Sequence, residues 1–148
     1  MGKLNLSHTY HKIWLHYIWA TKNRQPLITH DLKNKLIHHY KEYGKENDIC
    51  VDIANGIADH FHLLVGSKPS QSPAQIANLL EGESSNWINK NDFIKVKFNW
   101  QQGYSVFSVS ASGVADVRDY IRNQEVHHKK MTFQEEVEKF LKAYDIQY

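Results

Sequence analysis

Two strand-like runs lie almost end to end near the middle of the chain, and they constrain the fold more than any other feature. Residues 49–57 and 60–66 are rich in apolar and β-branched side chains, a composition typical of strands. Only Ala58 and Asp59 separate the two runs. Because parallel strands need a long crossover connection, these runs are predicted to form an antiparallel hairpin.

The segments on either side of this hairpin each predict one further strand and one helix. Residues 11–20 alternate as a strand does, and apolar side chains then recur at helical spacing from Leu32 until Gly44, the predicted stop. Beyond the hairpin, Ser72 is followed by a proline and then a glutamine in the pattern of a capping box, which predicts a second helix. A last strand is expected at about 104–109.

The resulting order, β-α-β-β-α-β, predicts an α+β fold of the ferredoxin-like split βαβ type. In this fold, both helices cover one face of an antiparallel sheet and leave the other face free. Two more helices are expected over about 112–127 and about 132–145, and the last carries an apolar stripe that must pack on its own core or on a partner subunit. We interpret residues 1–148 as a single domain with a core of about 11–110.

Composition excludes several classes of protein. No apolar run reaches the roughly 20 residues of a membrane span, and residues 1–8 lack the layout of a signal peptide. Cys50 is the only cysteine, which rules out an intrachain disulfide and favours the cytoplasm. The net charge of +2 is too small for binding nucleic acid by bulk electrostatics, so a polyanionic partner would need a local basic surface.

A histidine pair in the hairpin is the first candidate for chemistry. His60 and His62 stand two residues apart in a predicted strand, so both imidazoles project from one face while Phe61 projects from the other. Such a pair could hold a metal ion if a third ligand were supplied. In most proteins, however, two histidines at this spacing are exposed polar residues.

The predicted helix over 112–127 offers a second candidate pair. Tyr120 and Gln124 are four residues apart and therefore share one face of the helix. The structural alternative is that Tyr120 is a core residue and Gln124 a surface amide. Tyr104 is a rival for any role of a tyrosine, although its predicted strand position favours sheet packing.

Three sequence blocks together resemble a known family. Residues 58–65 (ADHFHLLV), 100–110 (WQQGYSVFSVS) and 117–124 (VRDYIRNQ) are similar to successive blocks of the single-tyrosine HUH transposases of the smallest bacterial insertion sequences, the IS200-like family. Residues 19–26 (WATKNRQP) are similar to the early segment of that family. The resemblance therefore covers most of the chain.

This resemblance implies an enzyme that cleaves and rejoins single-stranded DNA at hairpin-bearing insertion-sequence ends. By correspondence of the blocks, His60, His62 and Gln124 would bind Mg²⁺ or Mn²⁺, and Tyr120 would be the nucleophile that forms a 5′-phosphotyrosine intermediate. The family works as a homodimer in which the tyrosine helix of one subunit can complete the metal site of the other. The resemblance thus implies that an active site could be shared between subunits.

Other roles remain open at the level of sequence. Single-stranded DNA needs a basic track, and candidates for it, which could equally be solvated charges, are Arg118, Arg122, Lys22, Arg24, Lys95 and Lys97. The acceptor of the Tyr120 proton is not identified, and Asp119, His127, His128 and the charge pairs 129–130 and 135–136 are interpreted as solvated helix ends. The alternative functions are a non-catalytic single-stranded nucleic-acid-binding module of the same fold and a related HUH nicking endonuclease.

Overall fold

A four-stranded antiparallel sheet lies at the centre of the molecule. The computed structural model describes residues 2–148. The strands are β1 (Ile13–Ala20), β2 (Cys50–Ile57), β3 (His60–Ser67) and β4 (Ser105–Val109), in the spatial order β2-β3-β1-β4. Every neighbouring pair is antiparallel, including the predicted β2–β3 hairpin. The ferredoxin-like α+β fold expected from the sequence is confirmed.

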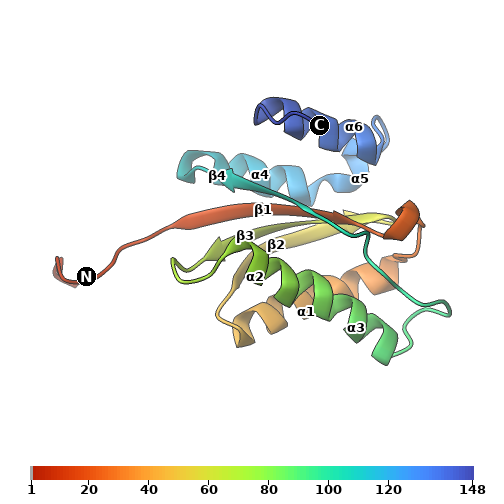
Figure 1. Ribbon diagram of the computed structural model, residues 1–148, viewed down its shortest axis with the longest axis horizontal. Coiled ribbons are helices and arrows are strands. Elements are labelled where there is room, and N and C mark those ends of the chain that lie inside the picture. The colour runs from red at the N-terminus through yellow and green to blue at the C-terminus, as the bar shows by residue number, and fades with distance from the viewer. Residues whose placement is uncertain (1) are drawn as a thin grey trace.

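Three helical segments cover one face of this sheet (Figure 1). They are α1 (His30–Glu46), α2 (Pro73–Ala77) and α3 (Glu83–Lys90), with a π-helical stretch, η2 (Asn78–Gly82), joining the last two. Ser72 forms the predicted capping box at the start of α2. Gly44, however, does not end α1. It is buried, and a Cβ there would lie 2.8 Å from the carbonyl oxygen of Ile49, so glycine is needed for close packing.

The other face of the sheet is also covered, contrary to the expectation of a free face. Helices α4 (Val114–Arg122), α5 (Gln124–His127) and α6 (Phe133–Ala143) lie across it (Figure 1). The apolar stripe of α6 packs on the sheet of its own chain. The Phe140 ring stacks on Phe107 with centroids 5.4 Å apart, and the Tyr144 hydroxyl donates a hydrogen bond to the Ser108 carbonyl at 2.7 Å.

The single helix predicted over 112–127 is wrong, because a break at Asn123 divides it into α4 and α5. Asn55 on β2 accounts for the break. Its side-chain amide donates to the carbonyls of Ile121 at 3.0 Å and Arg122 at 3.1 Å. A continuous helix would have bonded these carbonyls to amides one turn later, so a side chain of the sheet takes the place of the helical hydrogen bonds.

Strand alternation divides β1 between the two layers of helices. Tyr17 and Trp19 are buried in the core beneath α1 to α3, whereas His16 points toward α4 to α6. Short 3-10 turns, η1 (Lys22–Arg24) and η3 (Ala111–Gly113), follow β1 and β4. Across residues 2–148, the helices are all too short or too polar to cross a lipid bilayer.

Candidate functional site

Strand β3 holds the two histidines in fixed positions. His60 and His62 are both fully buried, and their ring centroids lie 5.3 Å apart. Phe61 points to the opposite side, where its ring contacts Tyr40 in the main core. The alternation predicted from the sequence is therefore confirmed, whereas the reading of the pair as exposed polar residues is wrong.

Helices α4 and α5 bring Tyr120 and Gln124 to the histidine pair. The Gln124 Oε1 atom lies 3.2 Å from His60 Nε2, and the Tyr120 ring centroid lies 5.9 Å from that of His62. Gln124 is buried, so it is not a surface amide. Tyr104 is placed elsewhere, with its ring against Tyr17 in the other layer. All four residues selected for chemistry thus meet at one point within a single chain.

Glu136 of α6 lies at the centre of this group, and its reading as a solvated helix end is wrong. Its Oε1 atom lies 2.9 Å from His62 Nε2 and 3.2 Å from His60 Nε2. Its Oε2 atom accepts hydrogen bonds from the Tyr120 hydroxyl and, at 3.3 Å, from the Gln124 amide. The side chain is fully buried.

A sequence signal for Glu136 does exist. On α6 it lies three residues after Phe133 and four before Phe140, and therefore in the middle of the apolar stripe. A carboxylate on the buried face of a helix is costly unless it is paired, so its presence there indicates a functional partner. The neighbouring glutamate at 135 caps the helix and conceals this signal.

His128 also belongs to the group, although the sequence predicted that it would be a solvated residue at a helix end. Its side chain is 6% exposed, and its Nε2 atom lies 3.1 Å from Glu136 Oε1. The Nδ1 atom lies 3.0 Å from the Met131 carbonyl, which can only accept a hydrogen bond, so Nδ1 carries the proton. Nε2 then presents a lone pair to the group, and it has no hydrogen-bond partner within the described residues.

Two outer residues orient the histidine pair. The His60 Nδ1 atom lies 2.8 Å from a carboxylate oxygen of Asp59, and His62 Nδ1 lies 2.8 Å from His16 Nε2. The other ring nitrogen of His60, Nε2, faces Glu136 and Gln124. Buried histidines that bind metals commonly have such a partner on the far side of the ring.

The electrostatics of the group are dominated by one buried carboxylate among imidazoles. Burial alone would raise the pKa of Glu136, but hydrogen bonds with His60 and His62 hold that pKa well below its ordinary value. Burial lowers the pKa of His62, and burial lowers the pKa of His16 to about 3, so His16 is neutral. Burial and the adjacent Glu136 carboxylate both raise the pKa of Tyr120, which is therefore held as a neutral phenol.

The donor atoms present suit a divalent cation. His60, His62, His128 and Glu136 each offer one ligand atom, and these atoms lie within 4.8 Å of one another. Imidazole nitrogen together with carboxylate and amide oxygen suits Mn²⁺, and the oxygens also suit Mg²⁺. The unpaired Nε2 atom of His128 is a buried polar group that a cation would satisfy.

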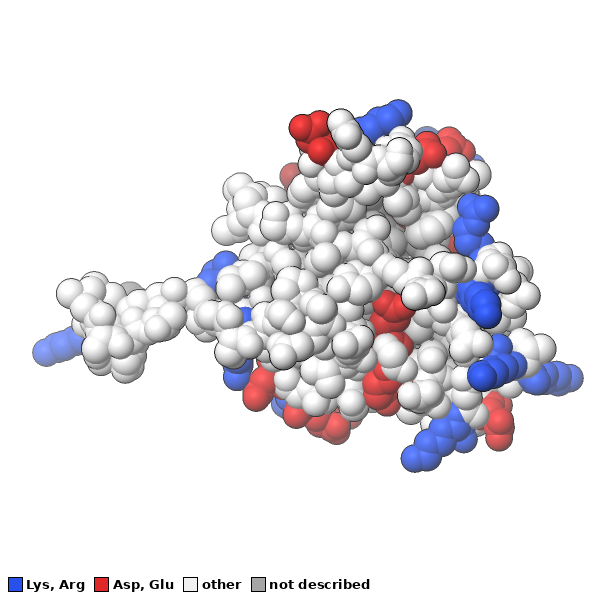
Figure 2. Space-filling model, in the orientation of Figure 1, with Lys and Arg blue, Asp and Glu red and all other residues white. Residues whose placement is uncertain are grey.

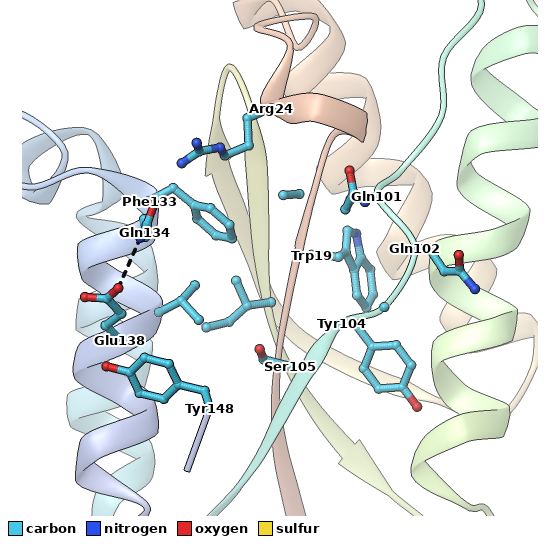
Figure 3. Close-up of a pocket in the computed structure, with 14 residues that line it drawn as sticks. Trp19, Arg24, Gln101, Gln102, Tyr104, Ser105, Phe133, Gln134, Glu138 and Tyr148 are labelled. Atoms are coloured by element: carbon cyan, nitrogen blue, oxygen red, sulfur yellow. Dashed lines mark hydrogen bonds between the residues drawn. The ribbon is translucent and has the colours of Figure 1, made fainter. Parts of the chain in front are cut away.

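Besides a cavity of about 340 Å³ lined by Tyr120, His16 and Phe140, two larger cavities lie nearby. One, of about 640 Å³, reaches it at Asp59 and His128 and is bordered by Arg24, Lys129 and Lys130. The other, of about 510 Å³, lies between α6 and the β1–β4 edge of the sheet (Figure 3). Arg24 and Phe133 line both cavities.

The predicted DNA-binding residues lie on three separate segments, η1, the loop before β4 and α4. Lys22 and Arg24 lie exposed on η1, and Lys95 and Lys97 lie exposed in the loop before β4. Figure 2 shows lysine and arginine side chains along the right-hand side of the view, where η1 and this loop lie in Figure 1. The two arginines of α4 form ion pairs within the chain: Arg118 Nε lies 2.9 Å from Asp52, and Arg122 lies 2.9 Å from Asp119.

Comparisons with known proteins identify a family and support the fold. The family described as "Transposase IS200 like" matches residues 9–124. The ISDra2 transposase TnpA of Deinococcus radiodurans is 25% identical over 114 residues, covering 74% of this chain and 81% of that protein. The transposase for insertion sequence element IS200 of Salmonella typhimurium is 25% identical over 126 residues, covering 81% of this chain and 82% of that protein.

Solved structures give the same result for the fold. The crystal structure of a candidate transposase from Deinococcus radiodurans R1 superposes with a TM-score of 0.64 at 25% identity, covering 84% of this chain and 98% of the other. The REP-associated tyrosine transposase bound to a REP hairpin superposes with a TM-score of 0.58 at 14% identity, covering 86% of this chain and 74% of the other.

Proposed function

Because the chain belongs to the IS200-like transposase family, we propose that it cleaves and rejoins single-stranded DNA at insertion-sequence ends through Tyr120. The observation that carries the proposal is the meeting of Tyr120, His60, His62 and Gln124 at one buried point. A non-catalytic module that stacks bases on its sheet is disfavoured, since helices cover both faces of this sheet. A nicking endonuclease would use the same groups for cleavage without strand transfer.

Tyr120 would act as the nucleophile. Its phenolic oxygen forms a bond to phosphorus while the bond from phosphorus to the 3′-oxygen breaks, which leaves a 5′-phosphotyrosine and a free 3′-hydroxyl. The phosphodiester bond is thus conserved in the protein–DNA link. A 3′-hydroxyl of another strand can attack this link in the reverse sense, and the strands are rejoined without a nucleotide cofactor.

Glu136 would orient the Tyr120 phenol, because its Oε2 atom accepts the hydrogen bond of the hydroxyl, while the low pKa of this carboxylate makes it a poor acceptor of the proton itself. The same contact disfavours the phenolate while the carboxylate stays charged and uncompensated, as the raised pKa of Tyr120 indicates. The arrangement therefore represents a resting state in which the Tyr120 hydroxyl stays protonated.

His60, His62 and Gln124 would hold a Mg²⁺ or Mn²⁺ ion. When bound, such an ion polarises the phosphoryl group and offsets the negative charge that develops on its oxygens. Asp59 and His16 orient the two imidazoles for this role from behind. We extend the metal dependence of this chemistry to the present chain as part of the proposal.

The DNA would reach the site along the two larger cavities, while Tyr120 itself lines the third, of about 340 Å³. Arg24, Lys129 and Lys130 border the larger one and could bind backbone phosphates, while Phe133 offers an aromatic surface beside His60, with ring centroids 4.5 Å apart. Lys22, Lys95 and Lys97 stay predictions for the approach of the strand. The neighbour bound to a REP hairpin supports a hairpin-bearing substrate. Homodimer formation and a cytoplasmic location also stay predictions.

Capture of a covalent adduct tests the proposal. The full chain is incubated with Mn²⁺ and labelled single-stranded hairpin oligonucleotides taken from the DNA that flanks its gene. We expect a denaturant-resistant adduct that is lost in Tyr120→Phe, because the phenylalanine has no nucleophile, and in His62→Ala. Tyr104→Phe is the matched control and should retain the adduct. An adduct with Tyr120→Phe, or no adduct with the native chain on any such end, would contradict the proposal.

A further inference from the structure

We propose that Glu136 and His128, contributed by the segment after the nucleophile helices, are ligands of the same metal centre as His60, His62 and Gln124. The inference rests on the metal dependence proposed above and goes beyond it, because it adds an anionic ligand and a third imidazole to the centre. The resemblance to the family ends at about Gln124, so these two residues lie outside it.

The distances are those of ligands around one cation. Glu136 Oε1 lies 2.9, 3.2 and 3.1 Å from the Nε2 atoms of His62, His60 and His128, respectively. Neighbouring ligands of an octahedral ion, each bound at about 2.1 Å, are separated by about 3 Å. Gln124 Oε1 stands in the same relation to His60 Nε2, at 3.2 Å.

The direction of the lone pairs supports the same conclusion. The Nδ1 protons of His60 and His128 are directed away from the group, toward Asp59 and the Met131 carbonyl. The Nε2 lone pair of His128 therefore faces Glu136 Oε1, which is itself an acceptor. Two acceptors about 3 Å apart repel each other unless a positive charge lies between them, and a bound cation satisfies all of these atoms at once.

Charge balance explains why Glu136 is needed. His60, His62 and Gln124 are neutral ligands, so a buried dication held by them alone has no compensating negative charge. Conversely, within residues 2–148 the ion-pair contacts of the buried Glu136 carboxylate are to imidazoles, and none is to a lysine or arginine. The buried dication and the buried Glu136 carboxylate would therefore neutralise each other.

The carboxylate also joins the centre to the nucleophile. Oε1 faces the imidazoles, whereas Oε2 accepts the hydrogen bonds of Tyr120 and Gln124. Binding of a cation would thus affect α6 directly, because Glu136 of this helix contacts the imidazoles and also accepts the hydrogen bond of the Tyr120 phenol. The geometry of the metal site would therefore depend on how α6 is packed.

Direct Mn²⁺ titration of the DNA-free chain tests the inference, with free Mn²⁺ followed by electron paramagnetic resonance and binding heat by calorimetry. Glu136→Gln keeps the shape of the side chain and removes its charge. His128→Asn keeps a donor for the Met131 carbonyl and removes the Nε2 ligand. Glu138→Gln removes the same charge from a position on α6 that bonds Gln134 instead, and it is the matched control.

We expect Glu136→Gln and His128→Asn to weaken Mn²⁺ binding roughly 10- to 100-fold, with Glu138→Gln at the native affinity. The visible spectrum of the Co²⁺-loaded chain should also change in the first two variants, as their ligand sets differ. Circular dichroism in EDTA separates loss of a ligand from loss of folding.

Native binding that is unchanged in both variants, with unchanged Co²⁺ spectra, would overturn the inference and leave the proposed function intact. If Glu136→Gln fails to fold, His128→Asn still decides between the outcomes. Absence of Mn²⁺ binding by the native chain would overturn both the inference and the proposed metal dependence. An adduct that forms without any divalent metal would overturn the proposed metal dependence and the inference, and it would still support Tyr120 as the nucleophile.

Discussion

Glu135 and Glu136 show how little the identity of a residue determines its role. The two side chains are adjacent and chemically identical. Glu135 is exposed and bonds the amide of Thr132 at the start of α6, whereas Glu136 is buried against the imidazoles. The difference arises from the angle of 100° between successive residues on a helix, which turns one carboxylate to solvent and the other to the sheet. A run of charged residues in a sequence does not show which of them faces the sheet until the orientation of the helix is known.

Glu81 is a second glutamate whose surroundings change its chemistry, and it predicts a pH dependence of stability. Burial raises the pKa of Glu81 from 4.5 to about 7. The folded state then binds this proton more tightly than the unfolded state, so the free energy of unfolding falls as pH rises through the range 4.5 to 7. Glu81→Gln cannot lose a proton and should be more stable than the native chain at pH 8 by about 1 to 2 kcal/mol.

Urea unfolding in EDTA at pH 4.5 and pH 8 measures this difference. The gain for Glu81→Gln should be present at pH 8 and nearly absent at pH 4.5. Glu46→Gln, an exposed change at the end of α1, is the control and should show the same small effect at both values. A gain for Glu81→Gln of equal size at both pH values would refute the assignment.

At the scale of elements, the break between α4 and α5 is set by the sheet and not by the helix itself. The sequence from 112 to 127 carries no proline or glycine at the break, so periodicity predicts one helix there. The Asn55 amide takes the last carbonyls of α4, and α5 starts again one residue later with Gln124 buried beside His60. The position of a candidate metal ligand thus depends on a strand far away in sequence.

Asn55→Ala should therefore impair the site as well as the fold. Loss of the two hydrogen bonds is expected to lower the free energy of unfolding by about 1 to 2 kcal/mol. The displacement of Gln124 should lower the rate of adduct formation by roughly tenfold or more. Asn91→Ala removes a similar bond, from its side-chain amide to the Trp87 carbonyl at the end of α3, and is the matched control.

Denaturant unfolding and the adduct assay, run on both variants, distinguish the two effects. Asn91→Ala should lose stability and retain the native rate of adduct formation. Equal losses of rate in the two variants would show that Asn55 acts through stability alone.

At the scale of the whole molecule, two layers of helices enclose the sheet, and the second layer completes the site within one chain. Tyr120 lies beside His62 of its own chain, with α6 packed over both. The sequence left open whether the last helices pack on their own core or on a partner. The hydrogen bond of Tyr144 to β4 and the stacking of Phe140 on Phe107 join α6 to its own sheet.

This arrangement predicts the result of a mixing experiment. Tyr120→Phe and His62→Ala chains, carrying different tags, are coexpressed and purified together through both tags. If each site uses its own tyrosine, every site of a mixed assembly lacks either the nucleophile or a metal ligand, and no adduct forms. Recovery of the adduct would show that the tyrosine helices are exchanged between subunits. The native chain with both tags serves as the positive control.

The sequence by itself determined the order of the elements, the hairpin, the capping box at Ser72 and the common face of His60 and His62, because these depend on local spacing and backbone geometry. It also led, through resemblance, to Tyr120 and Gln124. The covering of the second sheet face, the break at Asn123 and the burial of Glu136 and His128 were decided only by tertiary structure. Each of these depends on contacts between segments distant in the chain, and the periodicity of a single segment carries no information about what lies opposite it.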